Sequence, residues 1–190
     1  MTLRRGFKTQ ANEIAREIRY ELGLTPTDPL DPWALSEFLE IPFLPMSELS
    51  GVARSAVHYF TVVDTSVFSA VTVFDGSHRL IVYNDAHVPG RQASDMSHEL
   101  SHAILLHPPM PAIDQTGCRD WNQEAEEEAE WLSGVLLVPE EAAMLVVQKG
   151  LSTTVAAGLF GVTPKLMTSR INRTGARKRV ERARKYYILR

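Results

Sequence analysis

The chain has 190 residues, of which 44% are hydrophobic, and a formal net charge of −3. This length suits one core of ordinary size and is too short for two full domains. The single cysteine, Cys118, excludes an intramolecular disulfide, and no run of about 18 apolar residues could form a membrane span. The basic N-terminal segment lacks the apolar stretch of a signal peptide, so we expect a soluble, cytoplasmic protein.

The charge is distributed unevenly along the chain. Residues 1–169 contain 11 Lys and Arg against 22 Asp and Glu, a balance of −11. Residues 170–190 contain nine basic residues against Glu181 alone, a balance of +8. An acidic body with a basic tail indicates that the tail has its own partner or lies in solvent.

The first forty residues have helical patterns. Apolar residues recur along one stripe of residues 7–22, which predicts an amphipathic helix that ends at Gly23. A second, short helix is predicted over residues 33–40, with Asp31 as its cap and Pro32 in its first turn. These two helices precede a change of pattern.

Residues 51–83 are rich in Val, Phe and Tyr, which favours strands. We predict strands over residues 55–63, 66–74 and 78–84, with Asp75-Gly76 as a turn signal between the last two. Together they predict a small, mainly antiparallel sheet.

The remainder of the chain is predicted to be helical. Residues 92–106 form a helix that Pro108 stops, and residues 121–137 form the next one. A further helix over residues 140–149 precedes two or three short helices in the last forty residues. We therefore divide the chain into residues 1–150 and a helical C-terminal extension, 151–190.

The sequence HELSH, residues 98–102, lies within the helix predicted over residues 92–106. Side chains four residues apart share one helix face, so His98 and His102 can bind one metal ion. Glu99 lies beside them and can accept a proton from the attacking water. Two imidazoles and an adjacent carboxylate are the minimum set of a zinc hydrolase.

A third metal ligand is expected on the acidic helix that follows. Hydrolases of the HExxH…ExxxD kind take this ligand from such a helix, with an acid four residues later that orients a histidine. By that analogy Glu126 is the ligand and Glu130 is the orienting acid, while Glu128 is the rival ligand. His107 would lie about 140° from His102 on a continuous helix, so we expect it at the helix end or behind the ligands.

Several motifs in this order resemble the ImmA/IrrE family of metallo-endopeptidases. They are RLIVYN, HELSHAILLH, EEEAEWLSGVLLVP and FGVTPKLMTSRI. The pattern of that family is approximately HELGH…LH followed by ExEAxxFAxxLLMP. Ser101 replaces its usual glycine, Glu130 its usual Asp or Asn, and Val138 its methionine. None of these departures removes a predicted metal ligand. The longer side chain of Glu130 leaves open whether it orients a histidine.

The resemblance implies an α+β, zincin-like metalloprotease core, in which a small sheet packs on the HExxH helix and the acidic helix. It implies one zinc ion per chain, although Mn²⁺ or Fe²⁺ would also suit the ligands. It further implies a protein substrate, a helix-turn-helix (XRE-like) transcriptional repressor whose cleavage releases its genes.

Two alternative functions remain open at this stage. Residues 155–172 resemble a helix-turn-helix, and Arg170, Arg177, Lys178 and Arg179 could bind phosphates, as in a DNA-binding regulator. Alternatively, the C-terminal helices pack on the catalytic part of the chain. The other alternative is a pseudo-protease that binds a repressor or toxin without cleaving it.

Overall fold

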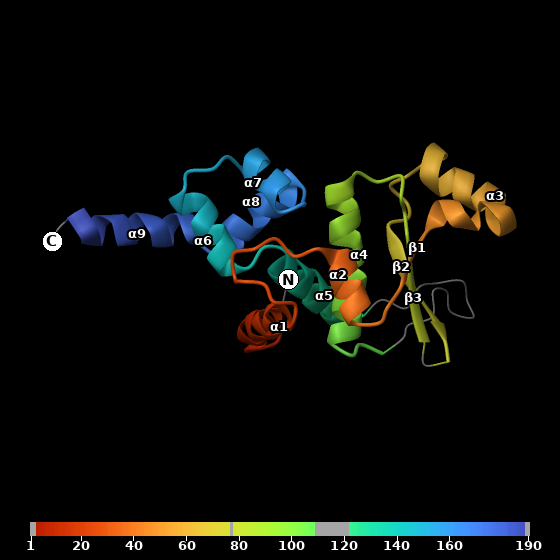
Figure 1. Ribbon diagram of the computed structural model, residues 1–190, viewed down its shortest axis with the longest axis horizontal. Helices are drawn as coiled ribbons and strands as arrows, with labels where there is room; N and C mark the ends of the chain where they lie inside the picture. Colours follow the sequence, from red (N-terminus) through yellow and green to blue (C-terminus); the bar gives the residue numbers. More distant parts are fainter. Residues whose placement is uncertain (1–2, 77, 109–121, 189–190) are drawn as a thin grey trace.

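A computed structural model describes residues 3–76, 78–108 and 122–188 of the chain, which form an α+β protein (Figure 1). Cys118 lies outside the described residues. The helices and strands in chain order are α1 (Phe7–Glu21), α2 (Pro32–Phe38), β1 (Phe43–Pro45), η1 (Met46–Leu49), α3 (Ser50–His58), η2 (Tyr59–Val63), β2 (Ala70–Asp75), β3 (His78–Tyr83), α4 (Pro89–Ile104), α5 (Gln123–Leu137), α6 (Glu140–Gln148), α7 (Thr153–Leu159), α8 (Pro164–Arg173) and α9 (Ala176–Ile188).

The sheet described by the structure has the strand order β1-β3-β2. β2 and β3 form an antiparallel hairpin, in which Thr72 pairs with Ile81. β1 runs parallel to β3, with Phe43 opposite Ile81. The sheet is therefore mixed, and the prediction of a mainly antiparallel sheet was wrong in this respect.

Residues 55–63 are helical rather than extended, which corrects a second prediction. They belong to α3 and η2, where Val57 is the buried residue. The Asn84 side chain donates hydrogen bonds to the carbonyl oxygens of Phe60, at 2.9 Å, and Phe68, at 3.0 Å. Strand propensity is a weak preference, and tertiary contacts of this kind override it.

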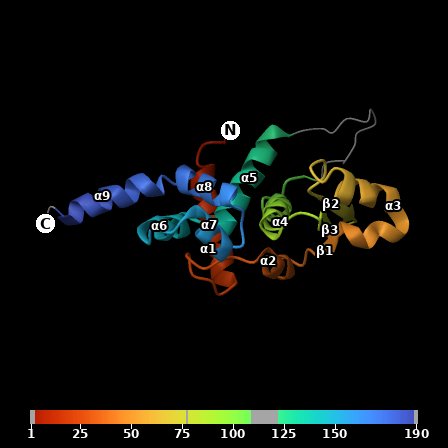
Figure 2. The ribbon, with the colours of Figure 1, turned by 90° about the horizontal axis from the view of Figure 1, so that it is seen from above.

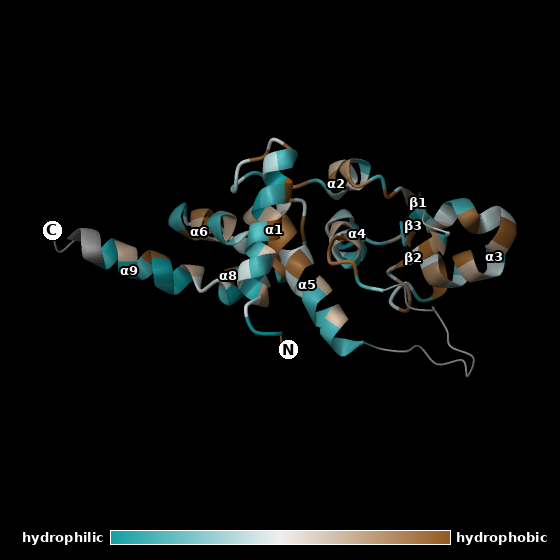
Figure 3. Ribbon diagram, turned by 90° about the horizontal axis from the view of Figure 1, so that it is seen from below, coloured by the Kyte–Doolittle hydropathy of each residue, from teal (hydrophilic) through white to brown (hydrophobic). Residues whose placement is uncertain are grey.

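Helix α4 lies in the middle of the molecule, between the sheet and α5 (Figures 1 and 2). Its buried residues include Met96 and Leu100, both fully inaccessible to solvent. Helix α5 is buried along most of its second half and also contacts α1 (Figure 3). The predicted cap of α2 is confirmed, because the Asp31 side chain accepts a hydrogen bond from the amide of Trp33.

The main hydrophobic core continues without a break into the C-terminal helices. Ala156 of α7, Met167 of α8 and Ala176 of α9 are completely buried in the same cluster as Leu136 of α5. Beyond this contact α9 extends away from the body, and the C-terminus lies at one end of the long axis (Figure 1). Among the described residues, no helix is both long and apolar enough to cross a membrane.

Candidate metal centre

Helix α4 presents His98 and His102 from successive turns. Because they are four residues apart, their rings share one face of the helix, with centroids 4.8 Å apart. The two Nε2 atoms lie 3.1 Å from each other. Both rings are partly exposed, so this pair lies at the surface of a helix whose opposite face is buried.

Helix α5 adds a carboxylate to this pair. Asn122 caps the helix by accepting a hydrogen bond from the amide of Ala125, which places Glu126 in the first turn. Its Oε2 atom lies 3.2 Å from Nε2 of His98, and its Oε1 atom lies 3.7 Å from Nε2 of His102. One donor atom from each of these three residues lies within 4.8 Å of the others.

The pKa values of Glu126 and His98 are both displaced by their neighbours. Hydrogen bonds to His102 and His98 hold the pKa of Glu126 well below its usual range. Burial alone would lower the pKa of His98, but the hydrogen bond to Glu126 and the charges of nearby glutamates outweigh it and raise that pKa. The carboxylate is therefore ionised and draws positive charge toward itself.

These donors fit a divalent metal ion. Two nitrogen atoms each about 2.0–2.1 Å from a tetrahedral zinc lie roughly 3.3 Å apart, close to the 3.1 Å between the imidazoles. Two imidazoles and one carboxylate are also a common protein ligand set for a catalytic zinc. The side chains already converge in the arrangement that such an ion requires.

Glu99 lies next to this cluster and is held by the sheet. Thr72 of β2 donates a hydrogen bond from its hydroxyl group to Oε2 of Glu99, at 2.6 Å. Glu99 and Glu126 line two adjoining cavities, one with His102, Thr72 and Phe74 and the other with His98, Asp95 and Ser69. The two cavities together form a cleft over the cluster, and Glu99 lines both of them.

His107 and Glu128 lie on the Nδ1 side of His102, and His107 also lines the cavity beside Glu99. Helix α4 ends at Ile104, and the positive φ of Leu106, 55°, turns the chain back so that Nδ1 of His107 lies 3.0 Å from Nδ1 of His102. The position of His107 at the helix end agrees with the prediction. Glu128 faces His107 and Arg4 rather than the cluster.

Glu130 and the basic candidates lie elsewhere. The side chain of Glu130 is 57% exposed and forms an ion pair with Arg173 at 2.8 Å, while its charge also acts on His98. Arg170 is 2% exposed and donates to the carbonyl of Val138, which conflicts with its predicted contact to nucleic acid. Arg179 forms an ion pair with Glu140, while Arg177 and Lys178 are exposed.

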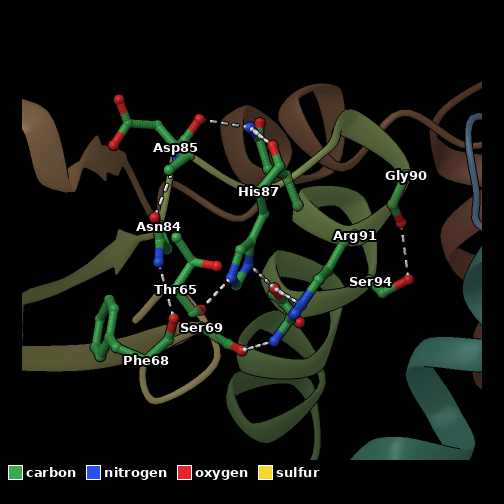
Figure 4. A network of polar contacts seen from close by, with 12 residues as sticks. Thr65, Phe68, Ser69, Asn84, Asp85, His87, Gly90, Arg91 and Ser94 are labelled. Atoms are coloured by element: carbon green, nitrogen blue, oxygen red, sulfur yellow. Dashed lines mark hydrogen bonds and ion pairs between the residues drawn. The ribbon is translucent and has the colours of Figure 1, made fainter. Parts of the chain in front are cut away.

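A polar network fixes the start of α4 beside the cleft (Figure 4). The buried ring of His87 contacts Asp95 through Nδ1, at 2.9 Å, and the carbonyl oxygen of Thr65 through Nε2, at 2.7 Å. Arg91 donates to the hydroxyl of Ser69 at 3.1 Å. Residues 65–69, which follow η2, are thereby tied to the start of α4.

Sequence reasoning missed several of these residues. Asp95 could have been found, since it lies three residues before His98 on the same helix face. Thr72 and Arg4 carry no such signal, because their partners Glu99 and Glu128 lie 27 and 124 residues away in sequence.

Two helices that bring a His-x-x-x-His pair, an adjacent glutamate and a carboxylate as third ligand to one cleft define the class of metallopeptidases. Residues 54–172, more than half of the chain, match peptidase family M78, the IrrE N-terminal-like domain. The chain belongs to this family, which confirms the resemblance to ImmA/IrrE proteins. No curated protein sequence matches the chain.

Proposed function

We propose that the protein is a zinc-dependent endopeptidase of the ImmA/IrrE type that cleaves a helix-turn-helix transcriptional repressor. The observation that carries the enzymatic part is the convergence of His98, His102 and Glu126 next to Glu99 in an open cleft. The membership of a peptidase family supports hydrolysis of a peptide bond. The repressor as substrate follows from the resemblance to ImmA/IrrE proteins.

The metal would be held by Nε2 of each histidine and the carboxylate of Glu126. When bound, it would supply Lewis-acid chemistry that activates water and stabilises negative charge on the substrate carbonyl. Glu99 is the general base in this proposal. Thr72 occupies one of its carboxylate oxygens, which leaves the other, Oε1, to accept the proton of the attacking water and pass it to the leaving amine.

The substrate must enter the cleft as an extended segment, because the cluster lies on a helix face between the two cavities. A repressor offers such a segment in a linker or surface loop, where backbone amides are not engaged in secondary structure. Cleavage there would separate its DNA-binding part from the remainder of the protein.

The test uses purified helix-turn-helix repressors, starting with one encoded beside the gene for this chain. We expect the wild-type protein loaded with zinc to cut the repressor once. Removal of the metal by a chelator should abolish cleavage, and zinc should restore it. Glu99→Gln should bind zinc with wild-type stoichiometry and lose at least about 100-fold in rate, since it removes the general base.

His98→Ala is the complementary variant, because it should lose zinc rather than the base. Full activity of Glu99→Gln, or stoichiometric zinc in His98→Ala, would contradict the proposal. Zinc-dependent cleavage of an unrelated unfolded protein, with repressors left intact, would support the peptidase activity but contradict the proposed repressor substrate.

A further inference from the structure

Three side chains on the Nδ1 side of His102 form a continuous series of polar contacts. His102 contacts His107 through the two Nδ1 atoms, at 3.0 Å, and Nε2 of His107 lies 3.5 Å from Oε2 of Glu128. The other carboxylate oxygen of Glu128 accepts a hydrogen bond from Nε of Arg4 at 2.5 Å. We call His107, Glu128 and Arg4 the supporting series.

The direction of these hydrogen bonds follows from the protonation of His102 as a metal ligand. If Nε2 of His102 binds a metal ion, the neutral ring carries its proton on Nδ1. That N–H donates to Nδ1 of His107, whose own proton is then on Nε2 and faces Glu128. Glu128 accepts from both neighbours, and Arg4 can only donate, so every contact in the series is satisfied.

The environment of Glu128 requires such partners. Its side chain is 8% exposed, and a buried carboxylate is costly unless it is paired and hydrogen-bonded. Arg4 is itself oriented by Gln10, which accepts from its guanidinium at 2.6 Å, and lies over the ring of Phe7. The carboxylate is thereby fixed toward His107.

We propose that His107, Glu128 and Arg4 are positioning residues that fix the tautomer and orientation of His102, so that the segment before α1 contributes to the metal affinity of the site. Partners of a ligating histidine raise its basicity, and their loss typically weakens metal binding by 10- to 100-fold. This inference rests on the proposed metal centre. It adds a contribution from Arg4, which lies outside the stretch matched to the family.

The experiment measures the zinc dissociation constant of the full chain by competition with a chromophoric chelator. His107→Ala should raise this constant by about 10- to 100-fold, since it removes the acceptor for His102. His107→Asn keeps an oxygen near the position of Nδ1, so it should recover most of the loss. A role in packing alone would give similar constants for both variants.

Two matched pairs test the remote members of the series. Arg4→Ala should raise the dissociation constant about threefold, as expected for a half-exposed ion pair, whereas Arg5→Ala, an exposed neighbour, should leave it unchanged. Glu128→Ala should weaken binding about tenfold or more, whereas Glu124→Ala, an exposed glutamate of the same helix, should not. The melting temperature of each metal-free variant checks that it is folded.

The inference fails if both members of each pair bind zinc equally, or if His107→Ala retains the wild-type constant. This failure is distinguishable from failure of the proposed function. If only the inference fails, the wild-type protein still binds zinc and depends on Glu99 for cleavage. If the proposed function fails, the wild-type protein itself binds no zinc or does not cleave.

Discussion

At the scale of single residues, the proposed metal ligands and the proposed general base have different partners. His98, His102 and Glu126 converge through atoms that suit a cation, whereas Glu99 turns toward β2. The hydroxyl group of Thr72 is the contact that fixes Glu99. A general base acts efficiently only when it is held within reach of the proton it accepts.

Thr72→Val should therefore lower kcat by about tenfold while leaving the zinc dissociation constant unchanged, because valine has the same shape but no hydroxyl group. Repressor cleavage under saturating substrate and zinc titration provide the two measurements. Thr61→Val is the control, since the hydroxyl group of Thr61 contacts the carbonyl of Val57 rather than the site. Unchanged kcat in Thr72→Val would show that Glu99 needs no such support.

At the scale of elements, α4 has two anchors. Its start is tied to residues 65–69 by His87 and Arg91, and its first turn packs closely on the backbone between α7 and α8. A Cβ atom at Gly90 would lie 2.7 Å from the carbonyl carbon of Val162 and 2.9 Å from the amide nitrogen of Thr163. The start of α4 is therefore packed directly against the C-terminal part of the chain.

Gly90→Ala should lower the free energy of unfolding by about 1–3 kcal/mol, because backbone atoms cannot move aside as a flexible side chain can. Urea unfolding of the metal-free protein measures this change. Gly158→Ala is the matched control, since no atom lies within 4 Å of its added Cβ atom, and it should stabilise α7 by about 0.5–1 kcal/mol. Equal stability of the two variants would contradict the close packing at Gly90.

The elements that sequence predicted well are those whose signals are local. The stripe that begins at Phe7, the cap at Asp31 and the spacing of His98 and His102 each act within a few residues, and the structure has α1, α2 and α4 in those places. The strand predicted over residues 55–63 was wrong because its contact to Asn84 is distant in sequence. β1 was missed as a sheet member because its partner β3 is also distant in sequence.

The same distinction applies to the site. The histidine pair and Glu99 could be predicted from one helical turn, and Glu126 could be proposed from the acidic helix by analogy. The preference for Glu126 over Glu128 is consistent with the geometry, since Glu128 faces Arg4. Which way each carboxylate points depends on packing between α4, α5 and the N-terminal segment, and no local pattern contains that information.

At the scale of the whole molecule, the two predicted parts share one core. Val180 of α9 is 3% exposed, and α9 contacts both α6 and α8. The division at residue 150 is not marked by a break in the buried cluster, which extends from Phe7 to Ala176. A main core that spans both parts in this way should unfold cooperatively.

We expect one urea transition, with the same midpoint by tryptophan fluorescence and by far-ultraviolet circular dichroism. Val180→Ala should lower the stability of that whole transition by about 2 kcal/mol, because it removes buried methyl groups. Arg182→Ala, an exposed change on the same helix, is the control. Two separated transitions, or an early partial loss of helix signal alone, would show that residues 151–190 unfold independently.

The extension of α9 along the long axis also places basic charge at one end of the molecule. Nine basic residues lie between Arg170 and Arg190, whereas the preceding 169 residues carry a balance of −11. Helix α9, which carries six of these basic residues, lies at one end of the long axis (Figure 1). An anionic surface should therefore attract this helix rather than the acidic remainder of the chain, although the net charge is −3.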